Sequence, residues 1–256
     1  MNSRGTLRTV RSLATLTAAL VVASAAVAEC PAEEGREAIL RSLLADLDVV
    51  PSEEKPLDFV SFLPLPSATS DCLVLVGVSE EGDCHACGAT VHLAELTATS
   101  GGWQTTLKQP RAFEMGAWGQ SPEPSLMHSG DRPFALKLSG ADMAFGYTSS
   151  FVSVVAKVDG WYREVLSLRT GASNCCTGDD EAQREWQATV EPIEIGSGFP
   201  DLRVTYSGTE ERDGAILSAA GTQEFRFDGE EYRLLEPGSP TSGSPPSRGR
   251  SKDHDR

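Results

Sequence analysis

Most of the chain from residue 71 onward consists of short apolar or alternating segments separated by Gly, Pro and Asp turns. Two of these turns are Asp-Gly pairs, at Asp159-Gly160 and Asp228-Gly229. An Asp-Gly pair favours a tight hairpin, because both central residues of a type I′ turn need positive φ. The pattern therefore predicts a mainly β fold of antiparallel hairpins, arranged as a curved meander or a propeller-like array.

Ten segments carry this strand pattern. They are Leu73–Val78, Ala89–Thr99, Trp103–Leu107, Phe134–Leu138, Tyr147–Val158, Tyr162–Leu168, Trp186–Ile195, Leu202–Tyr206, Glu224–Phe227 and Tyr232–Leu235.

One segment, residues 33–48, has helical periodicity instead. Its apolar residues Ala38, Ile39, Leu43, Leu44 and Leu47 recur at helical spacing. Acidic residues at its start favour the positive end of the helix dipole. Four prolines follow within residues 49–70, which we expect to be an extended connector.

The N-terminus has the layout of a secretory signal peptide. Arg4, Arg8 and Arg11 precede an apolar run from Leu13 to Val22, and an Ala-Val-Ala sequence ends at Ala28. This predicts cleavage near Ala28 and a periplasmic or secreted protein. No second apolar segment is long enough to span a bilayer, so we expect no membrane span in the mature chain.

The C-terminal residues 237–256 are rich in Pro, Ser and Gly and lack apolar periodicity. Such a segment cannot bury enough surface to offset the entropy of ordering, so we expect it to be disordered. Residues 29–236 then form a single disulfide-tied β domain with an N-terminal helix, and 1–28 the signal peptide.

The charge of the chain is strongly acidic, with 22 Lys and Arg against 37 Asp and Glu and a formal net charge of −15. Nucleic acids and anionic membranes bind clusters of Lys and Arg, so neither is expected as a partner. The expected partner is an unknown protein or a polymer of the cell envelope.

The chain has an even number of cysteines, all of which follow the predicted cleavage site: Cys30, Cys72, Cys84, Cys87, Cys175 and Cys176. In an oxidising compartment such cysteines favour disulfides. We expect Cys30 to pair with Cys72, and the loop of Cys84 and Cys87 to be joined to the Cys175-Cys176 loop. Both pairings close long loops, where a cross-link stabilises most.

The Cys84-His85-Ala86-Cys87 segment supports two chemical alternatives. Its C-x-x-C spacing is that of dithiol oxidoreductases, but a β-like run follows instead of the helix that lowers the thiol pKa. The same residues could hold a metal ion, zinc with Cys175 and Cys176 or copper with His85 and His92. Haem attachment is excluded, because Gly88 follows Cys87 where a histidine is required.

No nucleophile motif, zinc-protease motif or phosphate-binding loop occurs in the chain, so we expect neither catalysis nor a cofactor. A hydrolase whose site only the structure reveals is the third class of function. Aromatic residues beside glycines, Trp118, Phe145 and Tyr147, are the expected binding surface.

Two segments, Gly198–Val204 and Glu224–Tyr232, resemble exported bacterial proteins with FG-GAP-like β repeats, over about residues 196–236. Those repeats often carry an Asp-rich calcium loop, which this chain lacks, so calcium is not implied. The segment Asp83–Gly88 is similar to exported proteobacterial proteins, a resemblance that implies no activity. The sequence thus predicts an exported, noncatalytic binding or structural protein of the bacterial envelope. The alternative is a thiol-redox or metal-handling protein.

Overall fold

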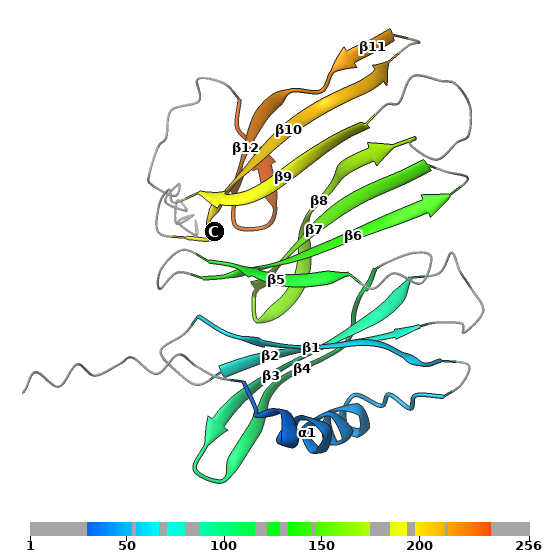
Figure 1. Ribbon diagram of the computed structural model, residues 1–256. Helices are drawn as coiled ribbons and strands as arrows, with labels where there is room; N and C mark the ends of the chain where they lie inside the picture. The colour runs from blue at the N-terminus through cyan, green and yellow to red at the C-terminus, as the bar shows by residue number, and fades with distance from the viewer. Residues whose placement is uncertain are drawn as a thin grey trace, which may run out of the picture.

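The computed structural model describes residues 30–52, 55–66, 71–79, 88–115, 122–128, 133–144, 147–174, 185–193, 198–212 and 215–236. These residues form two antiparallel sheets and one helix (Figure 1), which confirms the predicted mainly β fold. The elements are α1 (Glu33–Asp46), β1 (Leu57–Pro64), β2 (Asp71–Ser79), β3 (Ala89–Thr99), β4 (Gly102–Met115), β5 (Glu123–Met127), β6 (Ala135–Ala144), β7 (Tyr147–Val158), β8 (Trp161–Ser173), β9 (Glu185–Ile193), β10 (Asp201–Arg212), β11 (Ala215–Ser218), β12 (Gly221–Phe227) and β13 (Tyr232–Leu234).

The first sheet has the order β1-β2-β3-β4, and the second has the order β13-β12-β10-β9-β8-β7-β6-β5, with β11 paired to β10. Strands that follow one another within a sheet are neighbours, except at β11, which pairs with β10 while β10 also pairs with β12. This is the meander alternative of the prediction. The described strands do not form the separate blades that a propeller would require.

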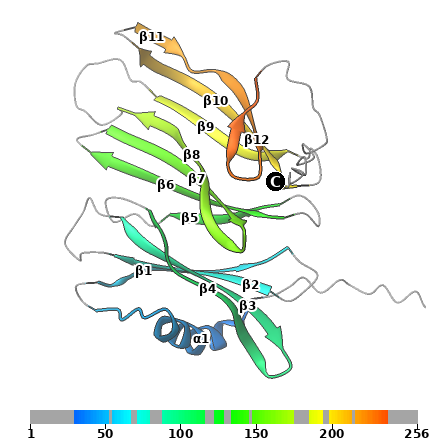
Figure 2. The ribbon, with the colours of Figure 1, turned by 180° about the vertical axis from the view of Figure 1, so that it is seen from behind.

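The molecule has three layers, seen from opposite sides in Figures 1 and 2. Helix α1 covers one face of the four-stranded sheet, and the nine-stranded sheet lies against the other face. Strand β2 shows the reason in its sequence. Leu73 and Leu75 belong to the core between the two sheets, while Val74 and Val76 belong to the core under the helix. A strand covered on both faces has a continuous apolar sequence instead of an alternating one.

Helix α1 begins at the predicted residue and ends two residues earlier than predicted. Asp48 has a φ of 56°, and the amide of Val49 donates to the carbonyl of Leu44. A residue in the left-handed region directly after a helix redirects the chain and satisfies the last free carbonyls. The helix packs through Leu43 and Leu47, which are buried against the sheet.

The segment 49–70, expected to be a connector, contains strand β1. This strand pairs with β2 at the edge of the four-stranded sheet, for example Phe62 opposite Val74. The prolines Pro56 and Pro64 flank or end the strand, positions that edge strands tolerate because an unpaired side needs no amide donor. The sequence also did not predict the short strands β5 and β11.

Both Asp-Gly pairs are at hairpins, as predicted, but with different turns. Asp159 and Gly160 have φ values of 53° and 87°, as a two-residue type I′ turn requires. At the second pair only Gly229 has positive φ. There the Asp228 carboxylate accepts hydrogen bonds from the amides of Glu230 and Glu231, which gives a longer turn between β12 and β13.

A polar cluster links the two sheets at the side of their shared core. The hydroxyl of Tyr162 on β8 donates to Glu95 Oε1 on β3 at 2.7 Å, and Lys157 Nζ donates to both Glu95 oxygens at 2.8 Å. The Gln109 side chain on β4 also bonds both backbone groups of Tyr162, at 2.6 and 2.8 Å. Burial, and then the hydrogen bond to Glu95, raise the pKa of Tyr162, so it stays a neutral donor.

Candidate functional site

The face of the nine-stranded sheet that turns away from the four-stranded sheet carries a third core cluster and a pocket. The buried residues of this third core cluster are Met127, Ala135, Val152, Val154, Ala156, Val165, Val190, Leu202, Val204, Phe225 and Tyr232. Strand β6 shows the alternation. Leu136 and Leu138 are 0% exposed in the core between the sheets, while Lys137 and Ser139 line the pocket on the opposite face. Successive side chains of a strand point to opposite faces of the sheet, so the polar residues of β6 face away from the core between the sheets and toward the pocket.

The pocket has a volume of about 540 Å³, within the range of small-molecule sites. Its lining residues come from five neighbouring strands of the curled sheet, from the edge strand β5 to the interior strand β9. They are Glu123 on β5; Lys137, Ser139, Gly140 and Ala141 on β6; Ser150, Phe151 and Val152 on β7; Thr170 on β8; and Ala188, Thr189, Val190 and Glu191 on β9. Strands β5 and β9 are separated by three others, so only a curved sheet brings them to one pocket.

The curvature has a local cause in the β7–β8 pair. Its register shifts twice, once between Ser150 and Phe151 and once between Val154 and Val155. An extra residue in one strand bends that strand and increases the local twist. Thr170, which lies beside the first irregularity, is 6% exposed and lines the pocket. The irregular pairing thus shapes the concave face.

Packing beneath the pocket holds β6 and β7 in place. The ring of Phe151 covers Gly140 in the neighbouring strand, and a Cβ at residue 140 would lie 2.5 Å from its Cζ. Val152 and Val190 line the pocket and are also buried in the third core cluster. The pocket walls therefore continue into well-packed core on two sides.

The polar groups that line the pocket are one ammonium group, two carboxylates and several hydroxyls. Lys137 is half-buried, and among the residues that the structure describes its ammonium group has no hydrogen-bond or ion-pair partner. Glu123 and Glu191 are exposed and line the pocket from β5 and β9. The hydroxyls of Ser139, Ser150 and Thr170 can both donate and accept hydrogen bonds. These groups can bind a polar ligand.

A second pocket, of about 570 Å³, lies between the end of α1 and the four-stranded sheet. Lys55, His92 and Arg111 line it, and His92 Nδ1 accepts a hydrogen bond from the Arg111 amide at 3.3 Å. All three residues also have polar or electrostatic partners elsewhere in the chain. The unpaired lysine makes the first pocket the stronger candidate.

The predicted site residues are placed only in part. Tyr147, at the start of β7, is 54% exposed, whereas Trp118 and Phe145 lie outside the described residues. Cys84, His85, Cys87, Cys175 and Cys176 also lie outside them, so the redox and metal alternatives stay predictions. Within the described part, no group of three or more His, Cys, Asp or Glu residues is placed to hold a metal ion.

Cys30 and Cys72 form a disulfide, the pairing expected from the sequence. The bond joins the residues before α1 to the first residues of β2, and Cys72 is buried in the core under the helix. Among the described residues, no helix is long and apolar enough to cross a membrane.

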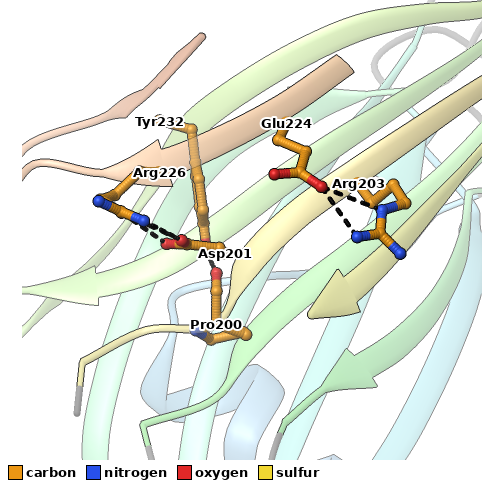
Figure 3. Close-up of polar contacts among 6 residues, drawn as sticks. All are labelled: Pro200, Asp201, Arg203, Glu224, Arg226 and Tyr232. Carbon is orange, nitrogen blue, oxygen red and sulfur yellow. Dashed lines mark hydrogen bonds and ion pairs between the residues drawn. The ribbon is translucent and has the colours of Figure 1, made fainter. Parts of the chain in front are cut away.

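A buried ion pair in the nine-stranded sheet is the other conspicuous polar cluster (Figure 3). The Asp201 side chain on β10 is 3% exposed. Its Oδ2 accepts hydrogen bonds from Arg226 on β12 at 2.9 and 3.0 Å, and its Oδ1 accepts a longer one at 3.4 Å. The hydroxyl of Tyr232 donates to the carbonyl of Pro200 at 2.8 Å. The hydrogen bond to Asp201 raises the pKa of Arg226, so the guanidinium group stays charged. All these groups satisfy one another, which indicates a structural role.

The Asp201→Asn variant is expected to lower the free energy of unfolding by about 2 kcal/mol, because it removes the charge from a desolvated hydrogen-bonded pair. Glu224→Gln is the matched control. It breaks the exposed pair of Glu224 with Arg203 and should cost less than about 1 kcal/mol. Urea denaturation of both variants measures the difference. Equal losses would contradict a special role of the buried pair.

Comparison with known proteins adds no relative: no family model, curated protein or solved structure matches the chain. The resemblance to FG-GAP-like repeats therefore stays a prediction. The pocket was not identified from the sequence. Its signal was Lys137 between Leu136 and Leu138, but any alternating strand with one solvated face has the same pattern.

Proposed function

We propose that the protein is an exported, noncatalytic binding protein of the bacterial envelope, which takes a small polar ligand in the pocket of the nine-stranded sheet. The observation that carries the proposal is the half-buried, unpaired Lys137 in a pocket of about 540 Å³. Ligand sites combine such a concave surface with a few convergent polar groups on an otherwise packed frame.

Export is supported by the signal-peptide pattern and by the Cys30–Cys72 disulfide, since disulfides persist in oxidising compartments. Binding is favoured over nucleophilic catalysis by the arrangement of the pocket. Within the described residues, no hydroxyl of Ser139, Ser150 or Thr170 is hydrogen-bonded to a histidine or a carboxylate. Activation of a hydroxyl nucleophile needs such an adjacent base.

A variant that fills the pocket tests the proposal. Ala141 lines the pocket opposite Ser150, so Ala141→Trp places a large side chain where the ligand would lie. The matched control is Gln104→Trp, at an exposed position of β4 in the other sheet. A library of polar metabolites is screened by thermal shift, and each hit is measured by isothermal titration calorimetry.

We expect the unmodified protein and Gln104→Trp to bind the same ligands, and Ala141→Trp to lose at least about tenfold in affinity, which is about 1.4 kcal/mol of binding free energy. A screen without ligands would contradict the proposal. So would ligands that Ala141→Trp binds as well as the unmodified protein does.

A further inference from the structure

We infer that the pocket selects a small organic acid with a single negative charge and several hydroxyl groups, and that its acid group pairs with Lys137. This inference rests on the proposed function and adds the chemical class of the ligand. It is drawn from the position of one lysine, the hydroxyls around it and the carboxylates at the edges of the pocket.

The position of Lys137 favours an anion. Its Cα partners are Ser125 on β5 and Val154 on β7, and Val154 is buried in the third core cluster. Among the described residues, no carboxylate pairs with the ammonium group, although the chain has a net charge of −15. A partly desolvated ammonium group without a partner is unfavourable. The acid group of a ligand would supply the missing partner.

The surrounding hydroxyls favour a ligand that is itself hydroxylated. Ser139 is the next residue on the same face of β6, and Ser150 and Thr170 line the pocket from β7 and β8. Each hydroxyl is one donor and two acceptors, and none has a side-chain hydrogen bond to another described residue. A ligand with hydroxyl groups can satisfy them, whereas an apolar ligand would leave them unpaired at a cost in free energy.

The carboxylates limit the charge of the ligand to one. Glu123 and Glu191 line the pocket from β5 and β9, the two outermost of its five strands, and Lys137 is the single cation among the lining residues. A second acid group on the ligand would face these carboxylates and the acidic field of the chain, and like charges in proximity are repelled. The same carboxylates can accept hydrogen bonds from ligand hydroxyls. The pocket thus favours monoanions over neutral polyols and over dianions.

Four probes of similar size test the class directly. Glucuronate and gluconate are hydroxylated monoanions, glucose is the neutral counterpart, and glucarate is the dianion. Binding of each to the full chain is measured by calorimetry at pH 7 and low ionic strength. We expect both monoanions to bind at least about tenfold more tightly than glucose and than glucarate.

Lys137→Met is the matched variant, because it keeps the apolar stem and removes the charge. We expect it to reduce the affinity for glucuronate at least about tenfold and to leave that for glucose within about twofold. The control is Lys108→Met, which removes the same charge from strand β4 of the other sheet, where Lys108 forms an exposed ion pair with Asp46 of α1. It should leave all affinities within about twofold, and both variants should retain the circular dichroism of the unmodified protein.

The outcomes separate the two proposals. Glucose bound as tightly as glucuronate, no probe bound, or an unchanged affinity of Lys137→Met would each overturn the ligand class. In all three cases the screen with the Ala141→Trp variant decides separately whether the pocket binds any ligand. Tight binding of glucarate would also overturn the class, because it would mean that the carboxylates of the pocket do not limit ligand charge.

Discussion

Removing the Cys30–Cys72 disulfide is expected to lower the free energy of unfolding by about 4 kcal/mol. The two cysteines are 42 residues apart, and the chain-entropy relation gives roughly this value for a loop of that length. The loop contains α1 and β1, so without the bond the unfolded chain gains freedom over the whole helical layer. Alanine at both positions avoids a free thiol in the core and a buried hydroxyl at residue 72.

Urea denaturation of the Cys30→Ala, Cys72→Ala double variant measures this loss. Hydrogen exchange tests whether the helix is also loosened locally. Because the bond anchors the chain just before α1, the amides of that helix should lose more protection, relative to the unmodified protein, than those of β7 and β8. The single Cys30→Ala variant is the control for the alanine at residue 72. A loss below about 1 kcal/mol in the double variant would show that packing of Leu43 and Leu47 holds the helix without the bond.

The Tyr162→Ala variant is expected to destabilise the protein by about 4 kcal/mol. Truncation of a buried aromatic side chain costs about 3–5 kcal/mol, because transfer free energy is lost and a cavity remains. Tyr162 is 1% exposed, and its ring lies 6.3 Å from that of Phe134 in the core between the sheets. The change also leaves Glu95, which is largely buried, with Lys157 as its remaining side-chain partner among the described residues.

Tyr162→Phe separates packing from hydrogen bonding. It removes only the donor to Glu95 and should cost about 1–2 kcal/mol. Tyr206→Phe is the matched control, because the Tyr206 hydroxyl bonds Gln223 at an exposed site, and it should change stability by less than about 0.5 kcal/mol. All three variants are compared by urea denaturation. A Tyr162→Phe loss equal to that of Tyr162→Ala would contradict the assignment of most of the effect to packing.

The predictions from sequence were accurate where local chemistry decides the structure. Asp159-Gly160 requires a tight turn because few residue pairs accept two positive φ values, so this hairpin could be predicted. The helix was predicted because its apolar residues have the spacing of one helical face. The Cys30–Cys72 pair was expected from loop length, but fifteen pairings of six cysteines are formally open, and geometry selects among them.

The errors have two causes, a strand partner that lies elsewhere in the chain and a side chain that bonds the backbone of its own turn. Strand β1 lies in a proline-rich segment without a strand pattern, and its partner β2 supplies the hydrogen bonds that make it a strand. Likewise, the turn at Asp228-Gly229 is lengthened by the Asp228 side chain, which competes with the two-residue geometry. At β1, pairing with β2 outweighs the weak strand preference of the segment. At Asp228, hydrogen bonds from the side chain to the turn amides outweigh the preference of Asp-Gly for a two-residue turn.

By itself, the sequence determined the mainly β fold, the single helix and the hairpin at Asp159-Gly160, because short-range sterics and periodicity are encoded residue by residue. Only the tertiary structure decided that the sheets pack in layers and that Glu123, Lys137 and Glu191 line one pocket. These residues are far apart in the chain, and the curvature that unites them arises from register shifts between paired strands. Strand pairing is a property of two segments together, so no single segment reveals the site.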